Sequence, residues 1–169
     1  MNSPTRENPI ARLQTLWQRL QPLPGGAWLF SRLLGWFIPY TGTIGARVVI
    51  LKHGVAQIQM RDRRRVRNHL NSIHALALAN LGELASGLAM LGALSPDTRG
   101  IPTRLTTEYF KKARGPLVAD SHCTPPSVTE DTDFEVYAEI HDAQGEVVAR
   151  TTVTWRLGPV PEAVSDKPA

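Results

Sequence analysis

The sequence has only one cysteine, Cys123, among its 169 residues. A single thiol cannot form an internal disulfide, and it cannot supply a structural zinc site that needs two or more cysteines. The first residues, MNSPTRENP, also lack the basic and then apolar layout of a signal peptide. We therefore expect a reducing, cytoplasmic location and no bound metal.

Long apolar segments are scarce near the N-terminus. The most apolar early stretch, Ala27 to Ile38, is too short to span a bilayer and contains Arg32. Its aromatic residues suit a membrane surface, although such helices more often pack on their own domain. With 42% apolar and 20% charged residues, the chain as a whole fits one globular domain with a buried core.

Three parts of the chain differ in character. Residues 9–38 have apolar side chains at helical spacing and are interrupted by prolines and glycines, which predicts two helices that end before Pro39 and Gly42. We expect residues 1–40 to form an N-terminal helical extension and residues 41–158 to form the main domain. Residues 159–169 are expected to be a disordered tail.

The main domain begins with a predicted hairpin and continues with one long helix. Two strands are expected at residues 46–51 and 55–60. Residues 72–94 are apolar on nearly all faces, so we predict a buried helix with Ser72 as its N-cap. Small residues such as Gly82 and Gly87 would let a sheet approach this helix closely.

Four further strands follow the helix. They are expected at residues 103–112, 116–123, 133–141 and 146–156, because these segments alternate or are rich in β-branched and aromatic residues. An antiparallel sheet of five to six strands wrapped around one long central helix buries the apolar surface of both. We therefore predict an α+β protein with the hot-dog arrangement and additional N-terminal helices.

Two motifs in this domain resemble a known superfamily. Asn68 is followed six residues later by His74, which is followed nine residues later by Glu83. This pattern is similar to that of the hot-dog thioesterases of the phenylacetate-pathway and 4-hydroxybenzoyl-CoA type. The segment TTEYFKKARG at residues 106–115 is similar as well. Over residues 45–157, the chain resembles most closely the DUF4442 branch of this superfamily.

The resemblance implies roles for individual residues. Glu83 would act as general base or nucleophile, and Asn68 would orient water or the thioester carbonyl. His74 would shape the turn that presents the backbone N–H of Ala75 to the oxyanion. Family members usually have two glycines after the histidine, whereas Ala75 and Leu76 stand here. The alanine keeps the N–H donor, and the leucine narrows the site.

Each of these residues also has a plainer interpretation. Glu83 would then be a glutamate on the helix surface, Asn68 a turn residue, and His74 a structural residue at the helix start. Thr103 lies near the place where related enzymes put a hydroxyl group from the partner subunit. The resemblance further implies a homodimer or homotetramer with pockets between subunits.

Basic residues gather just before Asn68. The segment RDRRRVR at residues 61–67 supplies much of the net charge of +4. We expect this segment to contact the phosphates of coenzyme A, since guanidinium groups pair well with phosphate. An anionic lipid head group or a solvated turn is the alternative, and no aromatic stacking or repeated basic spacing indicates nucleic acid. The arginines proposed to bind substrate are Arg63, Arg64, Arg65 and Arg67.

Together these features predict a thioesterase-like protein that hydrolyses a fatty or aryl acyl-CoA. Coenzyme A would enter only as part of the substrate, and no cofactor is expected. One alternative is a non-catalytic domain that binds acyl chains or lipids, in which Leu76 blocks the oxyanion approach. Another is a module that contacts a membrane surface or a partner protein weakly through its Trp-rich N-terminal helices.

Overall fold

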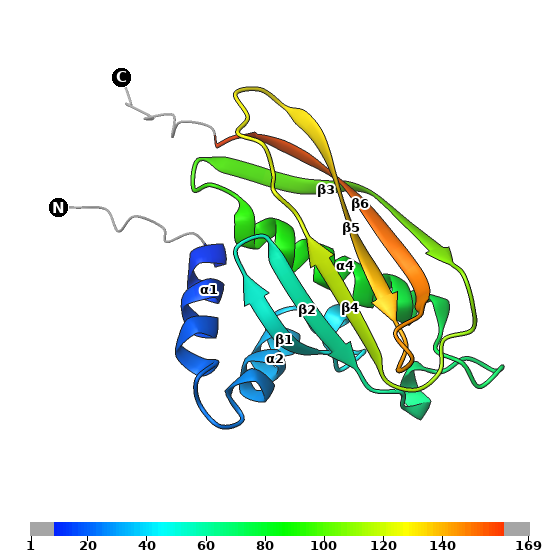
Figure 1. The fold of residues 1–169 in the computed structure, drawn as a ribbon. Helices are drawn as coiled ribbons and strands as arrows, with labels where there is room; N and C mark the ends of the chain where they lie inside the picture. The colour runs from blue at the N-terminus through cyan, green and yellow to red at the C-terminus, as the bar shows by residue number, and fades with distance from the viewer. Residues whose placement is uncertain (1–8, 161–169) are drawn as a thin grey trace, which may run out of the picture.

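The computed structural model describes residues 9–160 of the chain. An antiparallel sheet of six strands, in the order β1-β2-β4-β5-β6-β3, wraps around one long helix (Figure 1). This confirms the predicted hot-dog arrangement. The strands are β1 (Arg47–Lys52), β2 (Val55–Met60), β3 (Thr98–Tyr109), β4 (Leu117–His122), β5 (Thr132–His141) and β6 (Val147–Pro159). The helices are α1 (Pro9–Leu20), α2 (Gly26–Phe37), α3 (Pro39–Gly42), a short 3-10 helix (Arg64–Val66) and α4 (Ala75–Ala93).

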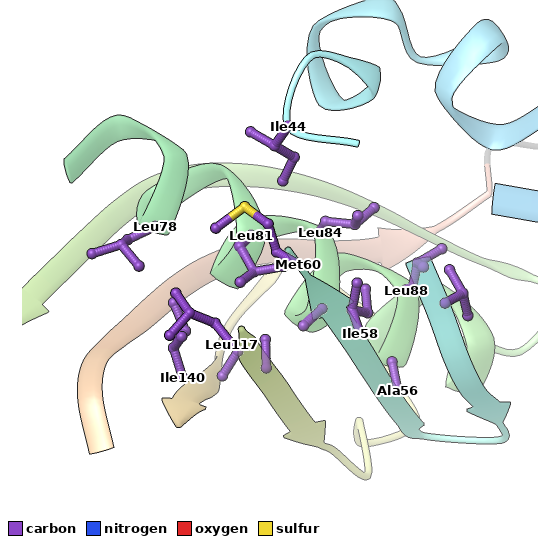
Figure 2. Close-up of a cluster of buried hydrophobic side chains, with 14 of the residues drawn as sticks. Ile44, Ala56, Ile58, Met60, Leu78, Leu81, Leu84, Leu88, Leu117 and Ile140 are labelled. Carbon is purple, nitrogen blue, oxygen red and sulfur yellow. The ribbon is translucent and has the colours of Figure 1, made fainter. Parts of the chain in front are cut away.

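Helix α4 forms the centre of the core. Its side chains are buried on most faces because the curved sheet surrounds it, and Figure 2 shows Leu81, Leu84 and Leu88 among the apolar side chains of the sheet. The helix is long and apolar enough to cross a membrane, yet 72% of its most apolar window is buried inside the protein. It is therefore the core helix of this domain.

The sheet approaches α4 most closely at Gly82. A Cβ atom at this position would lie 2.3 Å from Oγ1 and 2.5 Å from Cβ of Thr151 on β6. Only a glycine permits this separation, because real Cβ atoms do not approach other heavy atoms so closely. The close approach predicted for the small residues of the helix is thus realised here.

The start of α4 differs from the prediction. Its N-cap is His74, and Ser72 lies before the helix as a buried residue that donates from its backbone N–H and its hydroxyl to Oδ1 of Asn68. Asn71, which lies between Asn68 and Ser72, has a left-handed backbone with φ of 56°. The chain therefore completes a tight turn held by Asn68 before the first helical turn can begin.

Strand β3 begins five residues earlier than the predicted start at Thr103. It lies at the edge of the sheet and pairs only with β6 among the described strands. An edge position tolerates Pro102, whose nitrogen cannot donate a hydrogen bond to a neighbouring strand. The pairing shifts between Pro102 and Arg104, so that Thr103 is the extra residue of a β-bulge.

The two predicted N-terminal helices are present, and α3 continues the helical part beyond Pro39. This corrects the expectation that helix ends there, since a proline is well tolerated in the first turn of a new helix. Helix α2 buries one stripe, Gly26, Phe30 and Leu34, and lies beside β1 (Figure 1). The hydroxyl of Ser31 accepts a hydrogen bond of 2.9 Å from the Val48 N–H, which attaches α2 to the sheet.

Most of the predicted tail lies outside the described residues. Pro159 is the last residue of β6, paired with Thr98, so the predicted tail boundary at Pro159 falls within a strand.

Candidate active site

A narrow strip of α4 is left uncovered by the sheet. Between Ala75 and Met90, the residues that are not buried are Ala75, Leu76, Ala79 and Glu83. The spacing from Leu76 to Ala79 and on to Glu83 is three and then four residues, which places these side chains on one face. The strip therefore runs from the N-terminus of α4 to Glu83.

Glu83 is the one ionisable side chain within α4. It is partly buried, and within residues 9–160 its carboxylate has no hydrogen bond or ion pair. Burial raises the pKa of the Glu83 carboxyl above its ordinary value, because charge is less stable away from water. A raised pKa makes the carboxylate a stronger base, which is the property that a proton-abstracting group needs.

The structure places Trp155 of β6 near this carboxylate. A Cβ atom on Gly87 would lie 3.6 Å from Oε1 of Glu83 and 3.9 Å from Cζ2 of Trp155, so this glycine leaves space between the two side chains. Trp155 is 4% exposed, and its indole N–H is buried without a partner among the described residues. Sequence reasoning missed Trp155, because an inward aromatic residue on a strand has the pattern of an ordinary core residue.

The N-terminus of α4 supplies backbone donors at the other end of the strip. Nδ1 of His74 accepts a hydrogen bond of 3.1 Å from the Leu76 N–H. Ala75 is the first helical residue, and no hydrogen bond from its N–H is found in the described part of the chain. Such an N–H at a helix start can bind a negatively charged oxygen. The hydroxyl of Tyr109 donates to the carbonyl of Ala75 at 3.1 Å and ties β3 to this end of α4.

Asn68 holds the turn before the helix. Its Oδ1 accepts from the backbone N–H of Leu70 at 2.9 Å, from the N–H of Ser72 at 3.3 Å and from the Ser72 hydroxyl at 3.1 Å. In this arrangement Asn68 acts as a turn residue, which is the plainer of the two interpretations of its sequence position. No described contact joins Asn68 or His74 directly to Glu83, so the structure brings His74 together with Ala75 and leaves Glu83 farther along the same helix.

The arginines before Asn68 have separate environments. Arg63 donates to the carbonyls of Ile44 and Gly45, and Arg65 donates to the carbonyl of Thr43 at 2.7 Å. Arg67 pairs with Asp62 at 2.6 Å, and Asp62 also accepts from the Gly115 N–H at 2.9 Å. This arginine is the main reason why the pKa of Asp62 is lowered. Arg64 is exposed, with no carboxylate partner in residues 9–160.

Thr103 lies on the free edge of the sheet. Its hydroxyl donates to the carbonyl of Thr154 at 3.2 Å within the same chain. The edge carries exposed apolar side chains, among them Ile101 and Leu105. Because Tyr109 ties the end of β3 to Ala75, this edge borders the uncovered strip of α4. A second molecule that paired with the edge would therefore come close to the strip.

The donor set does not indicate a metal. Within the described residues, no group of three or more His, Cys, Asp or Glu side chains is placed to hold an ion. Burial raises the pKa of the lone thiol, Cys123, to about 11, so it remains protonated and is a poor ligand or nucleophile at neutral pH. The polar groups described on this face are the carboxylate of Glu83, the imidazole of His74, the hydroxyl of Tyr109, the indole N–H of Trp155 and backbone N–H groups.

Comparisons with known proteins agree with this fold. A family model described as a domain of unknown function, DUF4442, matches residues 26–157. A structural-genomics crystal structure is 29% identical with a TM-score of 0.76, and the match covers 88% of this chain and 98% of that one. A Pseudomonas aeruginosa protein of unknown function, described as a probable thioesterase, is 22% identical with a TM-score of 0.68 and coverage of 82% and 97%. A thioesterase family protein from Silicibacter pomeroyi is 18% identical with a TM-score of 0.63 and coverage of 77% and 96%. No curated protein matches the chain.

Proposed function

The chain belongs to the DUF4442 family, and from its hot-dog fold we propose that it is a thioesterase that hydrolyses a fatty or aryl acyl-CoA. The observation that carries this proposal is the Glu83 carboxylate. It lies partly buried on the uncovered strip of the core helix, with a raised pKa and no partner within residues 9–160. A partly buried charge without a partner costs stability, so its presence in a helix with no other ionisable residue calls for a role.

In the proposed reaction, Glu83 takes a proton from a water molecule, and the resulting hydroxide adds to the thioester carbonyl. The negative oxygen of the tetrahedral intermediate accepts a hydrogen bond from the N–H of Ala75 of the partner subunit, because Ala75 and Glu83 of one chain are eight residues apart, about 12 Å along α4. The intermediate then collapses, and its C–S bond breaks. The leaving thiolate takes the proton back from Glu83, which yields a carboxylic acid and free coenzyme A. The indole N–H of Trp155 is available as a further donor to the water or the carboxylate.

We propose that the active form is a homodimer, paired through the free edge of β3. A long edge strand with unpaired backbone groups and exposed apolar side chains favours pairing with another strand. A partner on this edge would lie over the strip between Ala75 and Glu83 and would shield the reacting groups from bulk solvent. Thr103 of each chain would then lie close to the strip of the other chain.

The phosphates of coenzyme A are proposed to contact the arginines near Asn68. Arg64 is the exposed member of this run that has no carboxylate partner in the described residues. Arg67 keeps further N–H donors beyond its bond with Asp62, since a guanidinium group has five. These two arginines are therefore the strongest candidates for phosphate binding within the run, ahead of Arg63 and Arg65.

The decisive experiment follows release of free thiol from a panel of fatty and aryl acyl-CoAs. We expect Glu83→Gln to lower kcat by at least about 100-fold, the usual effect of losing a general base. Glu130→Gln, which changes an exposed loop carboxylate in the same way, is the matched control and should leave kcat unchanged. Turnover by Glu83→Gln equal to that of the unaltered protein contradicts the proposal.

A specific observation keeps the non-catalytic alternative in view. Leu76 stands on the strip and is 62% exposed, next to the Ala75 N–H that would bind the oxyanion. If Leu76 closes this approach, the protein will bind acyl-CoA without releasing thiol, and Leu76→Gly will raise or create turnover. Binding of acyl-CoA by isothermal titration, together with the thiol assay on both proteins, distinguishes the two functions.

A further inference from the structure

A hollow of about 630 Å³ lies on the side of the domain formed by α2, α3 and the first two strands. Its lining includes Ser31 and Gly35 of α2, Thr41 and Gly42 of α3, and Val48 of β1. Helix α4 contributes Leu84 to the lining, whereas Glu83 is not among the lining residues. The hollow is therefore a feature separate from the candidate active site.

The hollow is lined by five arginines and by no acidic residue. No carboxylate in residues 9–160 forms an ion pair with any of them. Five like charges around one cavity repel each other, and an anion in the cavity would relieve this repulsion. The five residues are Arg32, Arg47, Arg61, Arg63 and Arg65.

Two of the arginines are held in place by the backbone. Arg63 donates to the carbonyl of Ile44 at 2.9 Å, and Arg65 donates to the carbonyl of Thr43 at 2.7 Å. Nε of Arg63 is buried and has no partner among the described residues. A fixed guanidinium group with an unsatisfied N–H is suited to donate hydrogen bonds to an oxyanion such as phosphate.

The rim of the hollow is aromatic and exposed. Trp28 and Trp36 line it with exposed fractions of 56% and 74%. The ring of Phe37 lies 5.1 Å from that of Trp36 and is 68% exposed, and Tyr40 in the neighbouring α3 is 69% exposed. The guanidinium of Arg32 lies 5.3 Å from the ring centre of Trp28. Helix α2 buries only its Gly26, Phe30 and Leu34 stripe, and the exposed fractions show that these rings face solvent in the described part of the chain.

We propose that this face docks on an anionic membrane, with the phosphate of a phospholipid head group in the arginine hollow and the aromatic rim in the bilayer interface. Large exposed aromatic residues next to arginines are the composition of surfaces that lie in that interface. A soluble phosphate compound would account for the arginines but not for the exposed rings. The proposal does not depend on thioesterase activity, because Glu83 takes no part in it.

The test is co-sedimentation of the full-length protein with vesicles of phosphatidylcholine alone or of phosphatidylcholine mixed with phosphatidylglycerol. We expect binding to the mixed vesicles, weakened by added salt. The double variant Arg32→Gln/Arg47→Gln removes two hollow charges that make no hydrogen bond to the backbone. It should bind about 25-fold more weakly, about fivefold for each charge. Lys112→Gln/Arg114→Gln removes the same charge from another exposed segment and should bind as the unaltered protein does.

A second pair of variants tests the rim. Phe37→Ala should weaken binding, whereas Phe110→Ala, which removes a phenyl ring that is 53% exposed and lies just beyond β3, should not. Equal sedimentation of the unaltered protein with neutral and anionic vesicles overturns the proposal. Loss of soluble coenzyme A binding in the hollow double variant, with vesicle binding kept, also overturns it and assigns the hollow to coenzyme A.

Discussion

The contact between Gly82 and Thr151 gives the sharpest test of how closely α4 packs against β6. In Gly82→Ala, the new methyl group would lie 2.3 Å from Oγ1 and 2.5 Å from Cβ of Thr151. Thr151 is fully buried and bonded to the hydroxyl of Thr107 at 3.0 Å, so it has little freedom to move aside. Helix and strand must therefore separate, at a cost of about 1–3 kcal/mol for overpacking.

Gly87→Ala is the matched control, because it makes the same change one to two turns later in the same helix. There the nearest atoms would lie at 3.6 Å and 3.9 Å, which are ordinary contacts. Alanine favours helix over glycine by about 1 kcal/mol, and both variants receive this gain. Gly87→Ala should thus be more stable than the unaltered protein by about 1 kcal/mol, and Gly82→Ala should be less stable than Gly87→Ala by about 2 kcal/mol.

The assay is thermal unfolding followed by circular dichroism, with urea unfolding as a check. For a chain of this size, a difference of about 2 kcal/mol corresponds to about 4–8 °C in Tm. If the two variants unfold at the same temperature, the close approach of α4 and β6 does not limit the packing, and the reasoning from Gly82 is wrong.

Two further predictions concern ionisable groups. The folded pKa of Glu83 is raised, so the stability that its protonated form contributes is present below the unfolded pKa and is lost as pH rises through the folded pKa. Glu83→Gln should therefore match the unaltered protein in stability at acidic pH and exceed it increasingly toward neutral pH. Urea unfolding at several pH values will measure this difference. The pKa of Asp62 is lowered by Arg67 and then by the Gly115 N–H, so its contribution is present at neutral pH and is lost on acidification. Asp62→Asn should lower the free energy of unfolding at neutral pH by about 1 kcal/mol, with a difference that shrinks in acid. An equal difference at all pH values would contradict the ion-pair explanation.

The central helix and most strands could be predicted because their signals are local. A segment that is apolar on all faces has to be buried, and alternating segments form strands whatever their neighbours are. The start of β3 could not be predicted, because Gly100 and Pro102 argue against a strand unless one knows that it lies at an edge. The N-cap was misassigned to Ser72, since the turn held by Asn68 fixes the helix start at His74.

The candidate site was predictable only in part. The spacing of Asn68, His74 and Glu83 indicated the region of the site. It did not predict that the side-chain oxygen of Asn68 accepts hydrogen bonds from the backbone of the turn. Trp155 comes close to the Glu83 region only through the pairing of distant segments. Likewise, the carbonyl partners of Arg63 and Arg65 are backbone atoms, which every residue has, so no residue type in the sequence could reveal them.

Because α4 is buried by strands on both sides of it in the sequence, the order of synthesis decides when the helix becomes covered. Of the strands that pack around this helix, β1 and β2 precede it in the chain, whereas β3, β4, β5 and β6 follow it. During synthesis, 19 residues of very apolar helix therefore emerge before most of the surface that will cover them exists. In that interval the exposed apolar helix can aggregate or bind to membranes. A chaperone that holds α4 until β6 is complete should therefore raise the yield of folded protein.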